Sequence, residues 1–174
     1  MKVEITDKEL CHDGFFQLER YHLRHELFAG GMSPPLVREL FVRGLAAAAL
    51  LYDPFLDKVV LVEQFRIGAL DHPSGAWLLE CVAGMVEEGE SVEDVIRREA
   101  IEEAGCSVAD MVRLYEFYPA PGGSSERVAL YIAKTDASQA RGIHGLDDEG
   151  EDIKVHAMAL DVALQHIESG RIAS

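Results

Sequence analysis

The sequence predicts an α+β fold in which strands outnumber helices, and three observations carry this prediction. Short apolar runs bounded by Gly, Pro and Asp recur along most of the 174 residues, as expected for strands. One amphipathic helix interrupts them midway, and a second follows after further strands. Because strands and helices do not alternate one for one, a sandwich of helices on a sheet is favoured over a wound βαβ sheet.

Residues 1–43 are predicted to form a small lobe of extended pieces. Phe15–Leu27 and Leu36–Val42 are the strand candidates, and Ala29-Gly30-Gly31 between them is a turn signal. So few strands do not bury a core by themselves. We therefore expect this lobe to pair with a second subunit, and the main domain to span residues 44–174.

The main domain is predicted to start with a hairpin of two apolar strands. Leu45–Tyr52 and Lys58–Arg66 are separated by Asp53-Pro54 and Asp57, which are typical turn residues. A brief apolar run, Trp77–Val82, follows the next loop. The remaining predictions are strands at Val112–Tyr118, Arg127–Ala133 and Ile153–Leu160, a turn at Pro121–Gly123, and a helix from Asp161 to about Ser169.

The central helix is predicted over Ser91–Ala104. Ser91 followed three residues later by Asp94 is a pattern typical of a helix N-terminus. Gly105 at the other end is a typical residue for ending a helix. Both boundaries are therefore predicted from local sequence.

Glutamates occupy the line on which the inward apolar stripe of this helix would continue. The stripe starts at Val92, Val95 and Ile96 and then meets Glu99 and Glu103, with Glu102 beside them. Carboxylates this close repel one another unless a cation lies between them. Mg²⁺ takes oxygen ligands, so the pattern indicates a divalent-metal site. The alternative is a solvated acidic face, which the inward position of the acids disfavours.

The spacing around this helix resembles the Nudix box. Gly84 is followed after five residues by Glu90, and after seven more by the block Arg98–Cys106, whose polar and glycine positions all match. Nearly the whole chain is similar to the bacterial ADP-ribose pyrophosphatases of that family, including Pro121, which lies 15 residues past Cys106. The other similar segments are Phe15-Phe16, Arg38-Glu39, Glu63–Arg66, Trp77–Gly84, Gly122–Arg127 and Gly142–Asp152.

This resemblance implies a fold, a reaction and an assembly. The fold is a Nudix-type α/β/α sandwich with a mixed sheet, preceded by a small N-terminal β lobe. The reaction is hydrolysis of ADP-ribose to AMP and ribose 5-phosphate, with Mg²⁺ as cofactor and Mn²⁺ as a substitute. The assembly is a homodimer with exchanged N-terminal lobes. Two alternatives stay open: a pyrophosphatase for ADP-glucose or GDP-mannose, and a nucleotide-binding module without catalysis, which the two intact acidic segments disfavour.

The resemblance also implies roles in metal binding and catalysis. Matching the motif places the general base at Glu149, in the acidic loop Asp147–Asp152, and makes Glu151 a further ligand. Gly150 stands where a larger polar residue is expected, which leaves the division of roles between the two glutamates open. The implied metal ligands are Glu99, Glu102, Glu103, Glu151 and the backbone carbonyl of Ala83, with Glu99 and Glu103 also counted as catalytic.

Substrate recognition is assigned by the same resemblance to four residues. Arg38 and Arg66 match positions that contact phosphates or ribose, and a guanidinium suits such oxygens. Phe15 is expected to stack on adenine across a dimer interface. Glu126 is expected to accept a hydrogen bond from a ribose hydroxyl.

Composition restricts the partners and the compartment. There are 31 acidic residues against 16 Lys and Arg, a net charge of −15, which disfavours nucleic acids and anionic membranes as partners. Residues 80–103 and 147–152 together carry −12 of that charge. Three cysteines without metal-site spacing, and an N-terminus without an apolar leader, predict a cytoplasmic protein. The natural chain is expected to continue past Ser174. The number of metal ions and the phosphorus that is attacked are left open.

Overall fold

The computed structural model describes all 174 residues, and the chain divides into two compact units. The first comprises Met1–Leu45 together with Phe117–Val128, and the second comprises Ala46–Glu116 together with Ala129–Ser174. The first unit therefore includes a segment that is distant in sequence from the N-terminal lobe. Within this unit, Phe41 forms a parallel bridge with Ser124 of that segment.

The first unit contains a three-stranded antiparallel sheet in the order β1-β2-β3. The strands are β1 (Val3–Asp13), β2 (Gln17–His25) and β3 (Leu36–Val42). Strand β1 was not predicted, because all of its residues are exposed and no buried stripe marks it in the sequence. Its contacts with β2 include an ion pair of 2.7 Å between Lys8 and Glu19.

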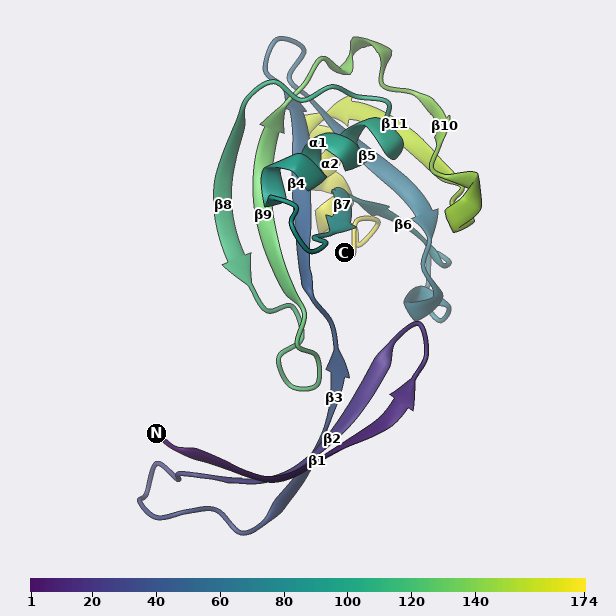
Figure 1. Ribbon diagram of the computed structural model, residues 1–174. Coiled ribbons are helices and arrows are strands. Elements are labelled where there is room, and N and C mark those ends of the chain that lie inside the picture. Colours follow the sequence, from purple (N-terminus) through teal and green to yellow (C-terminus); the bar gives the residue numbers. More distant parts are fainter. The chain divides into compact units, whose positions relative to one another are not determined.

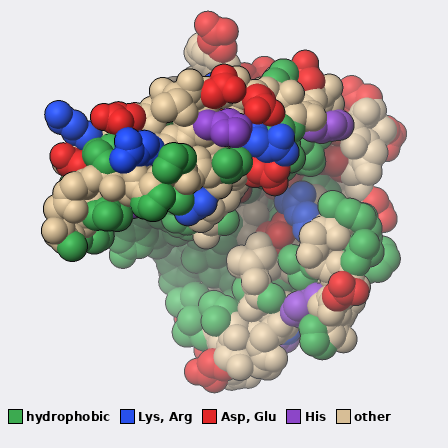
Figure 2. Space-filling model, turned by 90° about the horizontal axis from the view of Figure 1, so that it is seen from below, with side chains coloured by type: hydrophobic (Ala, Val, Ile, Leu, Met, Phe, Trp, Pro, Cys, Tyr) green, Lys and Arg blue, Asp and Glu red, His purple; other side chains and the backbone are tan.

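Charged and apolar side chains are mixed on the molecular surface. On the face that Figure 2 shows, basic side chains (blue) lie beside acidic ones (red) and hydrophobic ones (green), without a continuous basic patch. Ion pairs in the first unit follow this pattern, since Arg20 contacts Glu39 at 2.9 Å and Glu9 at 3.3 Å. Lys8 and Arg20 of this sheet thus have acidic partners, whereas Arg24 and Arg38 donate to backbone carbonyls.

The second unit is a sheet in the order β10-β11-β5-β4-β9-β8, with β6 paired to β5 and β7 paired to β4. Figure 1 shows helix α1 in front of this sheet and helix α2 behind it, which confirms the predicted α+β sandwich. Contacts join α1 mainly to β7, and α2 to β11 and β5. The elements are β4 (Leu45–Asp53), β5 (Lys58–Phe65), β6 (Trp77–Glu80), β7 (Val82–Met85), α1 (Val92–Glu102), β8 (Met111–Phe117), β9 (Arg127–Lys134), β10 (Gly142–His144), β11 (Ile153–Ala159) and α2 (Leu160–Glu168), with 3₁₀ turns at Ile67–Ala69, Ala137–Gln139 and Asp147–Glu149.

The predicted hairpin forms the centre of the core. Strands β4 and β5 pair with Asp53 opposite Lys58. Leu51, Val60 and Val62 are fully buried, because a helix layer covers each face of these strands. The two apolar runs of the sequence are therefore explained by burial on both faces.

The brief apolar run Trp77–Val82 of the sequence belongs to two strands, β6 and β7. β6 pairs with β5, with Glu80 opposite Val62, whereas β7 pairs with β4, with Ala83 opposite Ala48. The chain changes its pairing partner at Cys81, the residue between the two strands. Hydrophobicity does not report such a change of partner, and for that reason the sequence showed a single run.

Both predicted helices are confirmed. At the start of α1 the Ser91 hydroxyl oxygen accepts a hydrogen bond from the Asp94 N–H at 3.2 Å. At its end Gly105 adopts the left-handed conformation, with φ of 62°. Val95 and Ile96 are buried beneath the helix as the periodicity predicted. No helix in the structure is long and apolar enough to span a membrane.

Candidate active site

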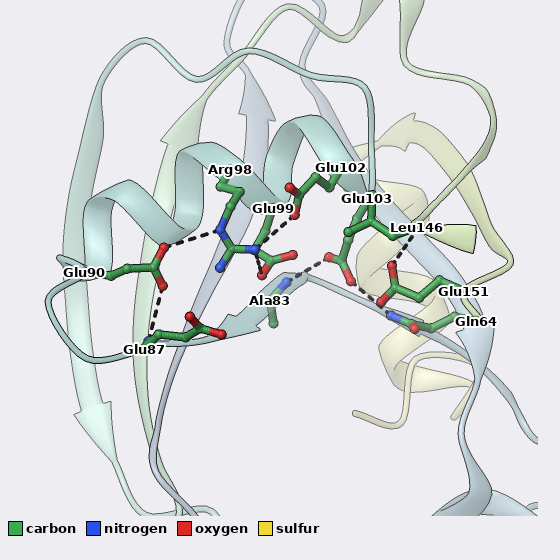
Figure 3. A network of polar contacts seen from close by, with 10 residues as sticks. All are labelled: Gln64, Ala83, Glu87, Glu90, Arg98, Glu99, Glu102, Glu103, Leu146 and Glu151. Atoms are coloured by element: carbon green, nitrogen blue, oxygen red, sulfur yellow. Dashed lines mark hydrogen bonds and ion pairs between the residues drawn. The ribbon is translucent and has the colours of Figure 1, made fainter. Parts of the chain in front are cut away.

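At the C-terminal end of helix α1, Glu103 points toward Ala83 of β7 and Gln64 of β5, and Glu99 and Glu102 lie beside Arg98, as Figure 3 shows. Glu103 is the most buried of them, with 3% of its surface exposed. Its Oε2 accepts a hydrogen bond from the Ala83 N–H at 3.0 Å, and its Oε1 accepts one from Gln64 Nε2 at 3.3 Å. Burial raises the pKa of Glu103 to about 8, although the Ala83 N–H opposes this shift.

Arg98 binds Glu99 and Glu102 of the helix and lies near Glu90, which precedes it. Its Nη1 donates to Glu99 Oε1 at 2.8 Å and to Glu102 Oε2 at 3.0 Å. Its Nε lies 3.5 Å from Glu90 Oε1. Burial raises the pKa of Glu99 to about 6 against the attraction of Arg98, and the neighbouring Glu102 and Glu151 contribute to the rise. The carboxylates thus share one cation and are still costly to ionise.

Gly84 leaves the space that Glu99 occupies. A Cβ atom at Gly84 would lie 1.8 Å from Glu99 Oε1 and 2.3 Å from its carboxyl carbon. Gly84 is not among the glycines with positive φ, so the need for glycine here is steric and not conformational. The glycine at the start of the box is therefore required for the closest approach of β7 to α1.

The acidic loop Asp147–Asp152 brings Glu151 near the same glutamates, on the side of Glu103 away from Arg98 (Figure 3). Leu146 N–H donates to Glu151 Oε2 at 3.1 Å, and the charge of Glu151 raises the pKa of both Glu99 and Glu103. Gly150 ends the 3₁₀ turn in the left-handed conformation, with φ of 69°. This conformation favours glycine and gives a physical reason for its departure from the expected polar residue.

A pocket of about 330 Å³ joins the loop to strands β5 and β6. Arg66 is the one cation among the residues that line it, and its Nε and Nη2 each lie 2.8 Å from Glu80 Oε2. Gln64 lines the pocket and also contacts Glu103, so one side chain connects the pocket wall to the helix glutamates. The lining residues are Gln64, Phe65, Arg66, Trp77, Glu149, Gly150, Glu151 and Asp152.

The structure thus brings together most of the residues that the sequence proposed for the site. Glu99, Glu102 and Glu103 lie on one face of α1, and Glu151 lies near two of them. Glu149 and Arg66 line the adjoining pocket. Ala83 contacts Glu103 through its N–H, and its proposed role as a carbonyl ligand stays a prediction.

Three other predicted residues, Phe15, Arg38 and Glu126, belong to the first unit. The Phe15 ring packs edge-on against Phe16, with centroids 4.7 Å apart. The guanidinium of Arg43 lies 4.9 Å from the Phe16 ring centroid, and its Nε is 3.6 Å from Glu126 Oε1. Arg38 donates to the carbonyl of its neighbour Val37. Their roles in substrate binding stay predictions.

Three residues near these groups were missed in the sequence as parts of the site. Gln64 had a signal, because it is a polar residue at an inward position of the apolar strand β5. Glu80 and Arg43 had none, because charged residues at strand ends are usually solvated. Their contacts depend on strand pairing, which sequence spacing does not show.

A second group of ligand-type side chains lies on the sheet of the first unit. Ligand atoms of Asp7, Glu9 and His22 all lie within 4.8 Å of one another. Glu9 already contacts Arg20 and His22, and Asp7 accepts a hydrogen bond from the Lys8 N–H. We assign no function to this group, because its members have partners within the protein.

The glutamates of α1 fit a hard divalent cation. The donors are all carboxylate oxygens, as such ions prefer. The raised pKa values of Glu99 and Glu103 show that their charges lack full compensation within the protein, although Arg98 is present. A cation among them would supply the missing compensation.

Comparison with known proteins agrees with this arrangement. The NUDIX domain model matches residues 42–172. An ADP-ribose pyrophosphatase of Escherichia coli (strain K12) is 53% identical over 170 residues, covering 98% of this chain and 81% of that protein. One of Haemophilus influenzae is 47% identical over 173 residues, covering 98% and 80%. A GDP-mannose pyrophosphatase of Enterobacter sp. (strain 638) is 36% identical over 177 residues, covering 99% and 89%.

A solved structure supports the fold. The crystal structure of an ADP compounds hydrolase superposes with a TM-score of 0.72 at 22% identity, covering 97% of this chain and 84% of that one. The box around α1, the domain match and the curated relatives all agree. The chain therefore belongs to the Nudix family of hydrolases.

Proposed function

We propose that the protein hydrolyses ADP-ribose to AMP and ribose 5-phosphate and that it requires Mg²⁺, for which Mn²⁺ substitutes. The observation that carries the proposal is the line of carboxylates at the end of α1, with Glu103 buried and Glu99 and Glu102 half-buried, beside a pocket lined by one basic residue, Arg66. Carboxylates suit a metal, and the pocket cation suits the anionic diphosphate. The relatives named ADP-ribose pyrophosphatases favour this substrate.

The proposed metal ligands are Glu99, Glu102, Glu103, Glu151 and the carbonyl of Ala83. When bound, a divalent cation neutralises the diphosphate and lowers the pKa of a water molecule. The chain prepares the ligands for this task. Arg98 orients Glu99 and Glu102, whereas the Ala83 N–H and the Gln64 amide orient Glu103.

Glu149 is the proposed general base. It lines the pocket from the loop, where its carboxylate can take a proton from the attacking water. Glu151 is tied to the Leu146 N–H and lies near Glu99 and Glu103, which suits a ligand better than a base. The water oxygen then bonds to one phosphorus, and the bond from that phosphorus to the bridging oxygen breaks.

Four residues are proposed to bind the substrate. Arg66 binds the diphosphate in the pocket, and Arg38 contacts phosphate or ribose. Phe15, a residue that is 94% exposed, stacks on adenine, and Glu126 accepts a hydrogen bond from a ribose hydroxyl. We further propose a cytoplasmic homodimer in which the N-terminal lobes, residues 1–43, are exchanged, so that these contacts reach across to the partner.

A substrate panel tests the proposal. Purified protein is assayed on ADP-ribose, ADP-glucose and GDP-mannose, with Mg²⁺ and with a chelator. We expect kcat/KM to be at least about tenfold higher for ADP-ribose, and activity to vanish with the chelator. GDP-mannose is the second candidate because relatives 36% identical carry that name. A preference for it would refute the proposed substrate, and activity with the chelator would refute the metal requirement.

A further inference from the structure

Glu80 and Arg66 share one face of the paired strands β5 and β6. Glu80 lies opposite Val62 in the register, and side chains two residues apart on a strand point to the same face. Gln64, which contacts Glu103, and Arg66, which follows the strand, therefore lie on the face of Glu80. Gln64 and Arg66 of this face line the pocket, together with Phe65 and Trp77 of the other face.

The Glu80 carboxylate is held on two sides. Its Oε2 accepts from both Nε and Nη2 of Arg66 at 2.8 Å, and its Oε1 accepts from the Ser174 hydroxyl at 2.9 Å. The Glu80 side chain is only 12% exposed, whereas that of Arg66 is 45% exposed. A sheltered, fixed carboxylate thus anchors a guanidinium that is still open to solvent.

This anchoring leaves part of the guanidinium for a ligand. Arginine has five N–H donors, and the contacts with Glu80 use the edge formed by Nε and Nη2. The Nη1 group remains for a phosphate oxygen. Because Arg66 is the only cation among the acids that line the pocket, its orientation affects the binding of any diphosphate there.

We propose that Glu80 is a positioning residue that holds Arg66 in the orientation that binds the substrate diphosphate. This inference rests on the proposed function, because it takes the diphosphate as the ligand of the pocket. An exposed arginine loses rotamer freedom when it binds a ligand, and Glu80 removes part of that loss beforehand. Loss of Glu80 therefore weakens substrate binding and leaves the chemical step nearly unchanged.

A double-mutant cycle tests this coupling. Glu80→Gln keeps the shape of the side chain but removes its charge, and we expect KM for ADP-ribose to rise about fivefold with kcat within about twofold. Arg66→Lys loses the two-pronged contact and is expected to raise KM further. If Glu80 acts through Arg66, the double variant resembles Arg66→Lys alone. Two independent, multiplying effects would overturn the proposal.

Glu63→Gln is the matched control. Glu63 lies on the other face of the same strand and pairs with Arg171 and His156, so its loss also removes a sheltered carboxylate from this strand pair. We expect its KM to stay within about twofold of the parent. An equal rise in KM for Glu63→Gln would assign the effect to general loosening of the strands and overturn the proposal.

Two further measurements keep the test decisive. The Nε–H signal of Arg66 in a ¹H–¹⁵N NMR spectrum is expected to be protected from exchange in the parent and not in Glu80→Gln; equal protection would contradict the proposal. If Glu80→Gln does not fold, Glu80→Asp, which withdraws the carboxylate by one methylene, replaces it in the cycle.

Calorimetric binding of ADP-ribose to the metal-free variants separates this proposal from the proposed function. Coupling in binding without hydrolysis by the parent would leave Glu80 as a positioning residue and refute the hydrolase activity on ADP-ribose. Hydrolysis of ADP-ribose by the parent, without coupling between Glu80 and Arg66 in binding, would support the hydrolase activity and refute the positioning role of Glu80.

Discussion

Two segments carry most of the negative charge of this protein, and they hold it in different ways. On α1, Glu103 is buried and fixed by two hydrogen bonds, and burial raises its pKa to about 8. In the loop Asp147–Asp152, Glu149 is exposed at the end of a 3₁₀ turn. The same residue type is thus rigid and reluctant to ionise in one place, and open to water in the other.

This difference matches two chemical tasks. A metal ligand has to stay in place, and a cation offsets the cost of ionising it in a buried position. A general base has to reach water and exchange its proton. The comparison therefore predicts that substitutions in the two segments affect different steps, and the following experiments test this from the largest expected effect to the smallest.

Glu103→Gln is expected to have the largest effect. Removing the most buried carboxylate should lower kcat/KM by at least about a thousandfold and weaken Mg²⁺ binding, because the metal loses a fixed ligand. Steady-state kinetics and Mg²⁺ titration measure the two effects. Glu93→Gln is the control, because Glu93 lies on the same helix but contacts Tyr131 instead. Near-normal activity of Glu103→Gln would contradict the assignment.

Glu149→Gln is expected to lower kcat by about a hundredfold or more while KM and Mg²⁺ affinity change little. The reason is that an exposed base acts in the chemical step and not in holding the metal. Single-turnover kinetics and Mg²⁺ titration separate the two. A weakened Mg²⁺ affinity with an unchanged single-turnover rate would exchange the roles of Glu149 and Glu151.

Gly84→Ala tests the steric fit between β7 and the helix. The added Cβ would collide with the Glu99 carboxyl group, so we expect activity to fall by about tenfold or more with weaker Mg²⁺ binding. Gly68→Ala is the matched control, because a Cβ at Gly68 meets no atom within 4 Å. Equal activities of the two variants would show that Glu99 tolerates displacement.

The smallest effect concerns stability and pH. The pKa values of Glu99 and Glu103 are about 6 and about 8, above the ordinary 4.5, so the folded metal-free protein binds more protons than the unfolded chain. The contribution of these groups to stability is therefore greatest below pH 4.5 and is lost as pH rises toward 8. We expect Tm of the metal-free protein to fall by a few degrees from pH 5.5 to 8.

Mg²⁺ should oppose this trend, because it binds the ionised carboxylates. The rise in Tm on adding Mg²⁺ is expected to be larger at pH 8 than at pH 6. Glu103→Gln should flatten both dependences. An equal rise in Tm at both pH values would show that Mg²⁺ binding is not linked to ionisation of these carboxylates.

Much of this protein was predictable because its signals are local. The ends of α1 follow from Ser91 and Gly105, and the 3.6-residue period places Glu99 and Glu103 on the side of Val95 and Ile96. The β4–β5 hairpin follows from two apolar runs and a turn between them. Residues within one helix or one hairpin are close in space wherever the rest of the chain lies.

The remaining features depend on pairing between distant segments. Strand β1 has no buried face to mark it, and the change of partner between β6 and β7 leaves the apolar run unbroken. The contacts of Gln64 with Glu103, and of Glu80 with Arg66, join residues 39 and 14 positions apart. The sequence alone placed Glu99, Glu102 and Glu103 on one helix and predicted a metal site there. Their burial, their hydrogen-bond donors and their proton affinities arise only when the strands pair, because desolvation depends on neighbours that the chain supplies from elsewhere.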